Sequence, residues 1–574
     1  MKKRLTLVLA VLMAVSLFTG CGTSTTEPTA PTSPATSEQP AGSSTPAPTE
    51  SVSKHVKNLV IGTTTTNDVF NLYSQSGAFG RLNYNCVANA YIAYIDNAKK
   101  IQPYFMKSYE ISEDGCELTF VYPTDKVFHD GTPVTAEDIE FTFKYYRDVV
   151  KNSYIKTLDT VTVDEASSTI VLKFSKADAY SYMANGATSQ SILPKHIWEN
   201  VETPKEFVDD KAAIGCGPYK LVSYDVDAGI SQYEAVPENN YLGEIMVDSI
   251  TVKCYGSDDA MLMAMLNGEI DTMYNYASPI SYTLLDLISG DANIDSGASP
   301  YAGNYQICFG MEEGRFFTDH AAREALIKAI DWNLMCQIIN GEYGQIPGAG
   351  IITPSCKGFD PSLPTFYQDI AEANKLLDDA GYADINGDGI RENKDGSELT
   401  VHITPQFSAK KKELLDRIAA VLGDALKNLG LASTVDSYPS SEAWEKEIVD
   451  GNYDMNIGYT TSGVAQYRTC FRYFVADVLP DDVENTAGST WIWGTNHDPK
   501  LTEEAWGITY SKNEAEYLEH IQTLQKMAAD DLFAFALCWE QCFFPYRTDK
   551  CANFDNWSGI GVINPETWFT ISAK

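Results

Sequence analysis

The sequence predicts an α/β protein with more than one domain. The chain has 574 residues, and at about 100 to 200 residues per domain this length indicates two or three domains with ample core. Two stretches indicate the class. Over 103–143 a strand pattern is followed by a capped helix, and over 410–459 helix and strand patterns alternate.

A strand between two tight turns is expected within 103–143. Leu118, Phe120 and Tyr122 are separated by single residues, which is the two-residue period of a strand with one buried face. Asp-Gly pairs at 114–115 and 130–131 bracket this strand. Both pairs are expected to be turns, because glycine tolerates the positive φ that such turns require.

A helix is expected to begin at Ala136. Thr135 stands at the N-cap position, and Asp138 follows three residues later as in a capping box. Val134 can pack against Ile139 as a hydrophobic staple across this helix start.

Further helices and strands are expected in the second half of the chain. The stretch 410–429 is amphipathic and ends at Gly430, with a buried side that comprises Leu414, Leu415, Ile418, Val421, Leu422, Ala425 and Leu426. A strand, LASTV, follows at once, and then come a helix around Trp444 and the strand-like segment YDMNIGYTTS. Ser511 and Glu514 form another capping box, which opens a helix to about Asp530.

The first residues are typical of a secretion signal. A basic start at 2–4 precedes an apolar run at 5–18, and small residues lead into Cys21. Because the run is shorter than the ~20 residues that span a bilayer, we expect a signal peptide over 1–20 rather than a membrane helix. A cysteine after the cleavage site resembles a bacterial lipobox, in which the thiol is diacylated. The alternative is an ordinary signal peptide with an incidental cysteine.

A flexible tether is expected after the signal. Residues 22–53 are almost entirely Ser, Thr, Pro, Gly, Ala and Glu, a composition that cannot bury enough apolar surface to offset its conformational entropy. The lipidated cysteine and the tether would occupy 21–56. Since no second apolar stretch of spanning length follows, we expect the folded body outside the membrane, anchored to its extracellular or periplasmic face by lipid alone.

Charge and cysteine content exclude some classes of partner. The net charge of −36 would repel nucleic acid and anionic lipid headgroups.

The twelve cysteines are spread thinly along the chain. With Cys21 lipidated an odd number remains, so at least one is unpaired. Cys538 and Cys542 could bridge or bind metal, although such residues are more often buried small hydrophobes.

The order of residues in 103–143 resembles the signature of the family-5 extracellular solute-binding proteins, the oligopeptide- and dipeptide-binding components of ABC importers. Their usual pattern contains P-x-L-A-x-S-W-E, D-G, T-F and F-H-D-G-x-P-V-T-A-x-D-V. The matching positions are Pro103, Ser108, Glu110, Asp114, Gly115, Thr119, Phe120, Phe128, His129, Asp130, Gly131, Pro133, Val134, Thr135, Ala136 and Asp138. Tyr109 stands where the family usually has Trp.

Later segments continue this resemblance. ILPKHIWEN at 192–200, IGCGPYKLVSYD at 214–225, the helix with its glycine stop at 258–271 and AAREALIKAID at 321–331 follow in the family's order. In the last segment Arg323 and Asp331 hold family positions, for which we expect a structural role. The resemblance covers essentially the whole body from about residue 58.

The resemblance implies an α/β, two-lobed periplasmic-binding-protein fold (Venus-flytrap, type II) with an extra subdomain inserted in the first lobe. Lobe I would comprise 57–85, 211–312 and 535–574, the inserted subdomain 86–210, and lobe II 313–534. The implied function is a monomeric substrate-binding lipoprotein of an ABC transporter for peptide transport. It would capture an extracellular oligopeptide-like solute between its lobes and deliver it to a membrane permease.

One family feature is missing from the predicted ligand site. Peptide-binding relatives hold the free α-amine with an aspartate in a D-Y-x-D-P run, but no aspartate occurs between Tyr459 and Val475. Either a carboxylate elsewhere in the sequence, such as Asp477 or Asp481, binds the amine, or the ligand has no free amine at the usual place. Polar, aromatic and cationic residues in that stretch would suit a carboxylate-bearing, sugar-like or capped ligand; they are Tyr459, Thr460, Thr461, Tyr467 and Arg468.

Other ligand-site residues come from aromatic and threonine-rich segments. The chain has 33 Tyr and nine Trp, whose flat rings with a polar edge bind peptide or sugar faces with little entropy loss. Trp491, Trp493 and Trp539 fall where relatives place cleft-lining residues, although each could instead be a packing residue. The threonine loop after the first predicted strand also faces ligand in the family; it includes Thr64, Thr65, Thr66 and Asn67.

One element resembles a calcium loop. Asp384, Asn386, Asp388, Gly389 and Asp395 follow the spacing D-x-N-x-D-G with an acid at the twelfth position. Such oxygens can wrap a hard cation, but Asp395 is shorter than the usual Glu, and a plain surface turn is the alternative. No cofactor is required for the predicted function.

Other function classes find less support. The seven histidines are scattered, and no HExxH, G-x-S-x-G or phosphate-loop motif accompanies them. We therefore expect no enzyme, although paired carboxylates of an extracellular glycoside hydrolase stay an alternative. Within the binding class, the alternative is a non-peptide ligand such as an oligosaccharide, an opine or a nickel chelate. A passive surface adhesin would show repeats, and none is seen.

Overall fold

The computed structural model describes residues 54–66, 68–73, 77–275, 279–301, 303–461, 474–475 and 496–574. The chain divides into two compact units, Met1–Val52 and Ser53–Lys574, and everything below concerns the second. Within the described ranges, no helix combines the length and the hydrophobicity that a membrane crossing requires.

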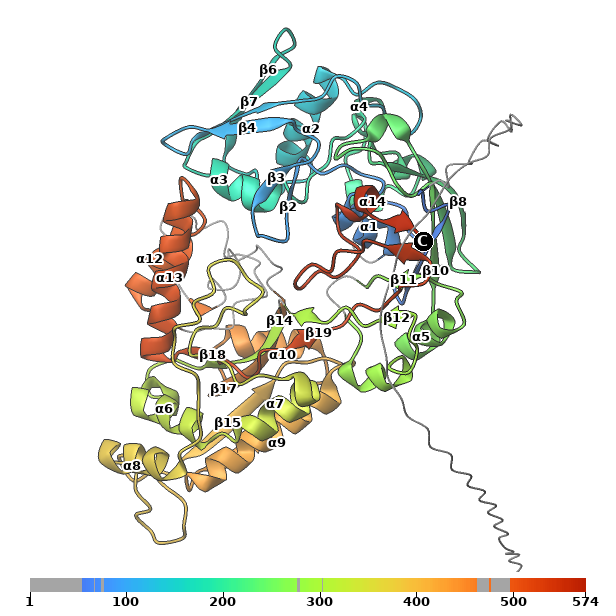
Figure 1. Cartoon of the computed structure of the whole chain (residues 1–574). Coiled ribbons are helices and arrows are strands. Elements are labelled where there is room, and N and C mark those ends of the chain that lie inside the picture. The colour runs from blue at the N-terminus through green and yellow to red at the C-terminus, as the bar shows by residue number, and fades with distance from the viewer. Residues whose placement is uncertain are drawn as a thin grey trace, which may run out of the picture. The chain divides into compact units, whose positions relative to one another are not determined.

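A seven-stranded sheet has the strand order β12-β20-β11-β1-β10-β9-β8. Its central strand β1 is parallel to β10 and β11, while the outer pairs are antiparallel. The strands are β1 (Leu59–Thr63), β8 (Tyr219–Asp225), β9 (Ile230–Ala235), β10 (Ser249–Cys254), β11 (Thr272–Met273), β12 (Ile294–Asp295) and β20 (Tyr546–Arg547). Helices α1 (Ala78–Leu82) and α5 (Asp258–Leu266) accompany this sheet, as Figure 1 shows.

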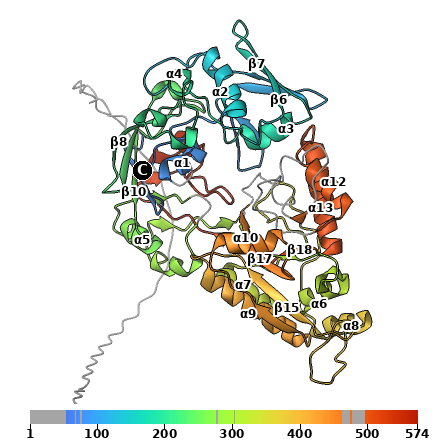
Figure 2. The same ribbon diagram turned by 180° about the vertical axis from the view of Figure 1, so that it is seen from behind.

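A five-stranded sheet has the order β16-β15-β17-β14-β18. Its strands are β14 (Gly303–Phe309), β15 (Thr400–Pro405), β16 (Ala432–Val435), β17 (Met455–Thr461) and β18 (Ala534–Ala536). Its helices are α6 (His320–Ala329), α7 (Trp332–Asn340), α8 (Ile370–Ala380), α9 (Lys412–Asn428), α10 (Ser441–Val449), α12 (Pro499–Gly507) and α13 (Glu514–Asp531). In Figures 1 and 2, α7 and α9 lie side by side along strand β15, and their apolar faces share one core with it.

A four-stranded antiparallel sheet, β4-β5-β7-β6, packs against helix α2. These elements are β4 (Ser108–Ile111), β5 (Glu117–Val121), α2 (Ala136–Asp148), β6 (Leu158–Asp164) and β7 (Thr169–Phe174). The predicted helix start is confirmed, because Thr135 and Asp138 form a reciprocal capping box. Both predicted turns are confirmed as well, with φ of +71° at Gly115 and +88° at Gly131.

The remaining elements are short. The paired strands are β2 (Ala93–Ile95) with β3 (Ile101–Pro103), β13 (Ser299–Pro300) with β19 (Gln541–Cys542), and β21 (Cys551–Ala552) with β22 (Ser572–Ala573). The short α-helices are α3 (Ala179–Ser181), α4 (Lys195–Trp198) and α14 (Thr567–Thr570). Short 3-10 or π helices occur at Asn83–Asn85, Tyr182–Gly186, Pro204–Glu206, Asp210–Ala213, Pro237–Asn239, Tyr282–Leu287, Phe316–Thr318 and Gly341–Tyr343.

The sheets can be compared with the predicted domain segments. The seven-stranded sheet takes its strands from 57–85, 211–312 and 535–574, and the four-stranded sheet lies within 86–210. The five-stranded sheet takes β15, β16 and β17 from 313–534, but β14 lies in a segment predicted for the first lobe. The lobe boundaries therefore stay predictions.

The helix predicted at 410–429 is α9, and its predicted end at Gly430 is confirmed by a positive φ of +67°. Its buried side chains are Leu415, Ile418, Ala419, Val421, Leu422, Ala425 and Leu426. Leu414 is only partly buried against this core.

The capping box predicted at Ser511 is wrong, although the helix itself is confirmed. Asn513 caps α13, because its side-chain oxygen accepts hydrogen bonds from the backbone N–H groups of Ala515 and Glu516. Ser511 lies in the preceding turn, where its hydroxyl donates to the carbonyl of Gly507 at 2.9 Å.

The segment around Gly217 crosses other backbone closely. A Cβ atom at Gly217 would lie 2.3 Å from the carbonyl oxygen of Val87, so only glycine fits. His129 fixes this crossing: its Nδ1 accepts from the N–H of Gly215 at 3.3 Å, and its Nε2 donates to the carbonyl of Gly217 at 3.1 Å. Burial lowers the pKa of His129 to about 4, so its role here is structural.

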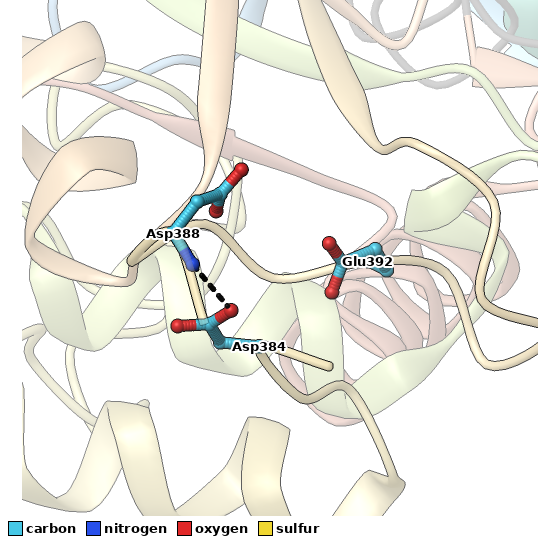
Figure 3. A group of neighbouring side chains, drawn as sticks. All are labelled: Asp384, Asp388 and Glu392. Carbon is cyan, nitrogen blue, oxygen red and sulfur yellow. Dashed lines mark hydrogen bonds between the residues drawn. The ribbon is translucent and has the colours of Figure 1, made fainter. Parts of the chain in front are cut away.

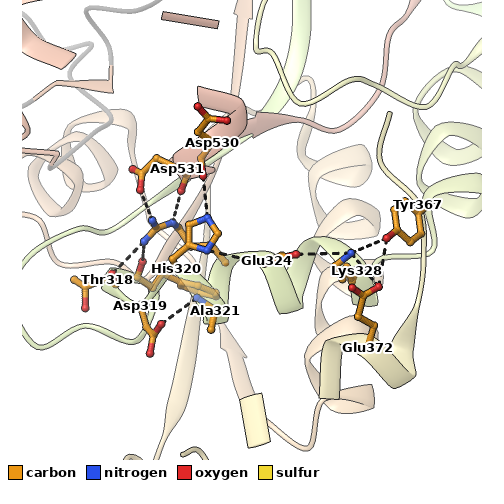
Figure 4. A network of polar contacts seen from close by, with 12 residues as sticks. Thr318, Asp319, His320, Ala321, Glu324, Lys328, Tyr367, Glu372, Asp530 and Asp531 are labelled. Carbon is orange, nitrogen blue, oxygen red and sulfur yellow. Dashed lines mark hydrogen bonds and ion pairs between the residues drawn. The ribbon is translucent and has the colours of Figure 1, made fainter. Parts of the chain in front are cut away.

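Arg323 fastens α6 to the end of α13. Its side chain is 2% exposed and donates to the carboxylate of Asp531 at 2.7 Å and to the backbone carbonyls of Phe317, Thr318 and Asp531. Figure 4 shows this network and, further along α6, Lys328 between its polar partners. The structural role predicted for Arg323 is confirmed.

Cys538 and Cys542 are both buried, and neither forms a disulfide bond. Cys542 donates to the carbonyl of Ser299 at 3.2 Å. Cys538 lies beside Cys336, whose thiol, together with burial, raises the pKa of Cys538. They behave as small buried side chains rather than as a bridge with each other.

Candidate functional site

Three tyrosines meet where strands β14 and β17 pair. Tyr305 is the direct cross-strand partner of Tyr459, and their ring centroids are 4.8 Å apart. The hydroxyl of Tyr459 donates to the hydroxyl of Tyr301 at 2.8 Å. Burial raises the pKa of all three hydroxyls, so they stay protonated and available for hydrogen bonding.

Lys411 covers this aromatic surface from the start of α9. Its Nζ lies 2.7 Å from the ring centroid of Tyr459 and 5.3 Å from that of Tyr305. Such contacts stabilise a cation through the negative face of the ring. Burial nevertheless lowers the pKa of Lys411 to about 7, an effect that the nearby Glu540 partly offsets.

Glu540 brings a carboxylate to the same place from the C-terminal part of the chain. The backbone N–H of Tyr301 donates to its carbonyl at 2.9 Å. Its Oε1 is buried and has no hydrogen-bond partner among the described residues. Burial raises the pKa of Glu540 to about 8, and Lys411 acts in the opposite direction. We call Tyr301, Tyr305, Lys411, Tyr459 and Glu540 the tyrosine cluster.

A cavity of about 480 Å³ lies beside the cluster at the carboxyl ends of β15 and β16. Gln406 connects the two, because it lines the cavity while its Oε1 accepts from the N–H of Tyr459 at 3.0 Å. The other lining residues are Pro405, Phe407, Ser408, Ala409, Lys412, Leu415, Asp416, Val435, Asp436, Ser437 and Tyr438. Cavities of this size at strand ends are common ligand sites.

Trp539 is 6% exposed and precedes Glu540 directly. Its backbone exchanges two hydrogen bonds with Gln345, at 3.0 and 2.9 Å, and its ring lies edge-on to Phe359. The structure therefore places it as a packing residue that positions the segment carrying Glu540.

Thr65 and Thr66 lie in the loop after β1. The N–H of Thr65 donates to the hydroxyl of Thr63 at 3.1 Å, and the carbonyl of Thr66 accepts from the N–H of Ala78 at 2.7 Å. Asn275 holds the neighbouring Thr63 hydroxyl. These contacts fix the loop to β1 and α1, and they do not join it to the tyrosine cluster.

Several predicted site residues lie outside the described residues. They are Cys21, Asn67, Tyr467, Arg468, Trp491 and Trp493, together with Asp477 and Asp481 and the side chain of Thr460. Their roles stay predictions. Of the predicted ligand residues, Tyr459 is the one that the structure places in the tyrosine cluster.

Sequence patterns missed Lys411, Glu540, Tyr301 and Tyr305. Lys411 reads as part of an ordinary helix start, and Glu540 is a single acid within an apolar stretch. Their proximity depends on pairing between distant strands, and no local motif encodes that. One sequence feature could have indicated Glu540: it directly follows Trp539, which was predicted to line the ligand cleft.

The predicted calcium loop brings a different set of acids together. Asp384, Asp388 and Glu392 place ligand atoms within 4.8 Å of one another, and Figure 3 shows them around one loop. Glu392 is 6% exposed and accepts from the side chain of Asn386.

Asp395 does not join this group. Its Oδ1 accepts from the backbone and hydroxyl of Ser397, at 2.9 and 2.6 Å. The twelfth-position residue of the predicted loop is therefore not in this group, in which Glu392 accompanies Asp384 and Asp388. Carboxylate oxygens of this number fit a hard cation such as calcium, whose binding stays a prediction.

Comparisons with known proteins agree with these observations. Residues 100–477 match the family described as bacterial extracellular solute-binding proteins, family 5. The oligopeptide-binding protein AppA of Bacillus subtilis is 24% identical over 426 residues, which cover 71% of this chain and 73% of that relative.

Solved structures show the same fold. The B. subtilis AppA structure, in complex with a nonapeptide, has a TM-score of 0.65 at 19% identity and covers 90% of this chain and 99% of its own. NikZ from Campylobacter jejuni, in complex with Ni(L-His), has a TM-score of 0.67 at 20% identity with coverage of 90% and 99%. The predicted α/β, two-lobed periplasmic-binding-protein fold is confirmed.

Proposed function

Because the chain belongs to the bacterial extracellular solute-binding proteins of family 5, we propose that it captures an extracellular oligopeptide-like solute and delivers it to the membrane permease of an ABC importer. The observation that carries this proposal is the tyrosine cluster, which combines aromatic faces with a buried carboxylate oxygen that lacks a partner among the described residues. Folded proteins rarely leave such a group unpaired, so a ligand is a natural partner.

The proposed mechanism is binding without covalent chemistry. The solute contacts both lobes only in the closed form. Because it therefore binds the closed form more tightly, it shifts the equilibrium from the open form to the closed form. Aromatic rings supply contact area at low entropic cost, and the cavity beside Gln406 supplies room for a side chain or a sugar ring. The permease would then recognise the loaded form.

A peptide is the preferred ligand class, and a non-peptide is the second candidate. AppA of B. subtilis is named for oligopeptide binding and was solved with a nonapeptide, whereas NikZ was solved with Ni(L-His). The second candidate is favoured by the absence of an aspartate between Tyr459 and Val475. It comprises an oligosaccharide, an opine or a nickel chelate.

We further propose a lipid-anchored, monomeric protein on the outer face of the cell membrane, with no enzymatic activity. The cysteine at 21 and the Ser/Thr/Pro-rich segment after it support the anchor. Fractionation tests this: the full chain should pellet with membranes, and Cys21→Ala should release it to the medium. Turnover of chromogenic glycosides or peptides by purified protein would instead revive a hydrolase.

Solute capture is tested by thermal unfolding of the purified protein with four ligand classes: peptides, oligosaccharides, opines and nickel chelates. We expect peptides to raise the Tm in a concentration-dependent manner, because a ligand that binds only the folded state stabilises it. A shift with one of the other classes would select the second candidate. Failure of every class to raise the Tm would contradict solute capture.

A further inference from the structure

Helix α3, from the part of the chain that forms the four-stranded sheet, touches helix α13 of the five-stranded sheet. The rings of Tyr180 in α3 and Tyr517 in α13 have centroids 5.5 Å apart in an edge-to-face arrangement. Both rings are buried, and they share one apolar cluster with Ile521 of α13. Ile101 and Ile111 pack against this cluster from strands β3 and β4. The two parts of the protein therefore share buried surface at this point.

A second contact lies at the turn before α13. A Cβ atom at Gly115, in the turn between β4 and β5, would lie 2.9 Å from the Cα of Lys512. The carbonyl of Gly115 accepts from the N–H of Ala179 at 3.0 Å, so this turn and α3 form one surface. Lys176 adds a charged contact, because its Nζ lies 5.1 Å from the ring centroid of Tyr510. We call these residues the clasp: Gly115, Lys176, Tyr180, Tyr510, Lys512 and Tyr517.

Helix α13 joins the clasp to the tyrosine cluster. The clasp lies at the start of this helix, and only Leu532 and Phe533 separate the end of the helix from strand β18. Strand β18 pairs with β14, which carries Tyr305 of the tyrosine cluster. No residue belongs to both the clasp and the cluster. An effect of the clasp on solute binding must therefore act through the conformation of the chain.

Contacts between separate parts of a two-lobed protein depend on its conformation. They form when the lobes close and separate when the lobes open. The free energy of such contacts adds to that of the solute in the closed form, so it shifts the equilibrium in the same direction. A very strong contact would also close the empty protein and exclude solute. Edge-to-face and cation–π contacts are each weak, which suits a reversible closure.

We infer that the clasp holds the closed form shut and thereby sets how long a captured solute stays bound. This inference rests on the proposed function and goes beyond it, because the clasp acts on solute release from outside the tyrosine cluster. Breaking the clasp destabilises the closed, loaded form. It should therefore raise the rate of solute release and leave the association rate close to that of the wild type.

Cross-linking measures the clasp in the unaltered chain. Cys116 follows Gly115 directly, and Lys512 is exposed, so a short reagent with a maleimide and a succinimidyl ester should join the Cys116 thiol to the Lys512 amine. The probe is a peptic digest of casein, and the oligosaccharides, opines and nickel chelates of the unfolding screen are run beside it. With a class that raises the Tm, we expect the yield of the link in peptide mass spectra to rise about threefold. Lys512→Arg keeps the charge and should give no link.

Rates of solute release, measured by stopped-flow tryptophan fluorescence, assign the effect to the clasp. Tyr180→Ala should raise the release rate about tenfold, and Lys176→Glu should raise it about threefold. Lys176 is only partly buried, so its variant keeps the test valid if Tyr180→Ala disturbs folding. Lys107→Glu makes the same charge change at an exposed position outside the clasp, and it should release solute at the wild-type rate.

The outcomes separate the clasp from solute capture itself. Equal link yields with and without a solute that raises the Tm overturn the inference, and solute capture stands. Wild-type release rates in both clasp variants also overturn it, whether or not the Tm of the ligand-free protein falls, because the contact would then serve the fold alone. Failure of every solute class to raise the Tm overturns solute capture and the clasp together.

Discussion

Replacing Glu540 by Gln should make the ligand-free protein more stable at alkaline pH. Glutamine keeps the shape of the side chain and removes its charge. Burial raises the pKa of Glu540 from 4.5 to about 8, so the folded protein holds this proton through a window in which the unfolded chain loses it. At about 1.36 kcal/mol per pKa unit, ionising the carboxylate above pH 8 lowers the free energy of unfolding by about 3 to 5 kcal/mol.

The sign of the effect follows from proton binding. Between pH 4.5 and 8 the folded state binds more protons at Glu540, so stability falls as pH rises. Lys411 opposes this at higher pH, because its pKa is lowered from 10.5 to about 7; the unfolded chain then binds more protons, and stability rises between pH 7 and 10.5. Glu540→Gln should therefore abolish the loss of stability between pH 4.5 and 8 and keep the gain of stability between pH 7 and 10.5.

The assay is urea unfolding followed by tryptophan fluorescence at pH 5 and pH 9, on protein freed of ligand. Wild type and Glu540→Gln should have the same midpoint at pH 5, where the carboxyl is neutral. At pH 9 the variant should unfold at a higher urea concentration than the wild type. The control Glu413→Gln, which changes an exposed side chain, should have the same urea midpoint as the wild type at both pH values. A variant that is equally or less stable at pH 9 would refute the reasoning, since the carboxylate would then be paired in the folded protein.

The remaining predictions concern the frame around the site. Arg323→Met should cost about 2 to 4 kcal/mol of unfolding free energy, because it leaves three backbone carbonyls without their donor; a loss no greater than that of Asp531→Asn would contradict this. Gly217→Ala should cost about 2 to 3 kcal/mol through its clash with Val87, against a neutral Gly290→Ala in open space, and equal midpoints in urea would disprove the close crossing. Calcium should raise the Tm of the wild type and of Asp395→Asn but not of Asp384→Asn. A calcium response that Asp395→Asn abolishes, or no response in the wild type, would argue against the acids grouped with Glu392.

Local signals predicted much of the secondary structure. The start of α2 was readable because Thr135, Asp138 and the Asp-Gly turns act within a few residues of one another. The cap of α13 was misassigned because Ser511 and Asn513 are both good N-cap residues in the same short stretch. A spacing rule cannot decide between two such residues, whereas the path of the backbone does.

The site was less predictable, because it joins residues that are far apart in sequence. Tyr305 and Tyr459 meet through strand pairing, Lys411 arrives from a helix start, and Glu540 comes from the end of the chain. Family resemblance predicts ligand contacts in the stretch after Tyr459, which lacks the aspartate of peptide-binding relatives. No local pattern predicts the buried carboxylate of Glu540, because its position depends on how distant strands pair.

Native mass spectrometry of protein purified without denaturation, before and after exposure to free-ended peptides, tests the central claim most directly. We predict one bound solute per chain. A spectrum that shows only the bare chain under both conditions would contradict solute capture at this site.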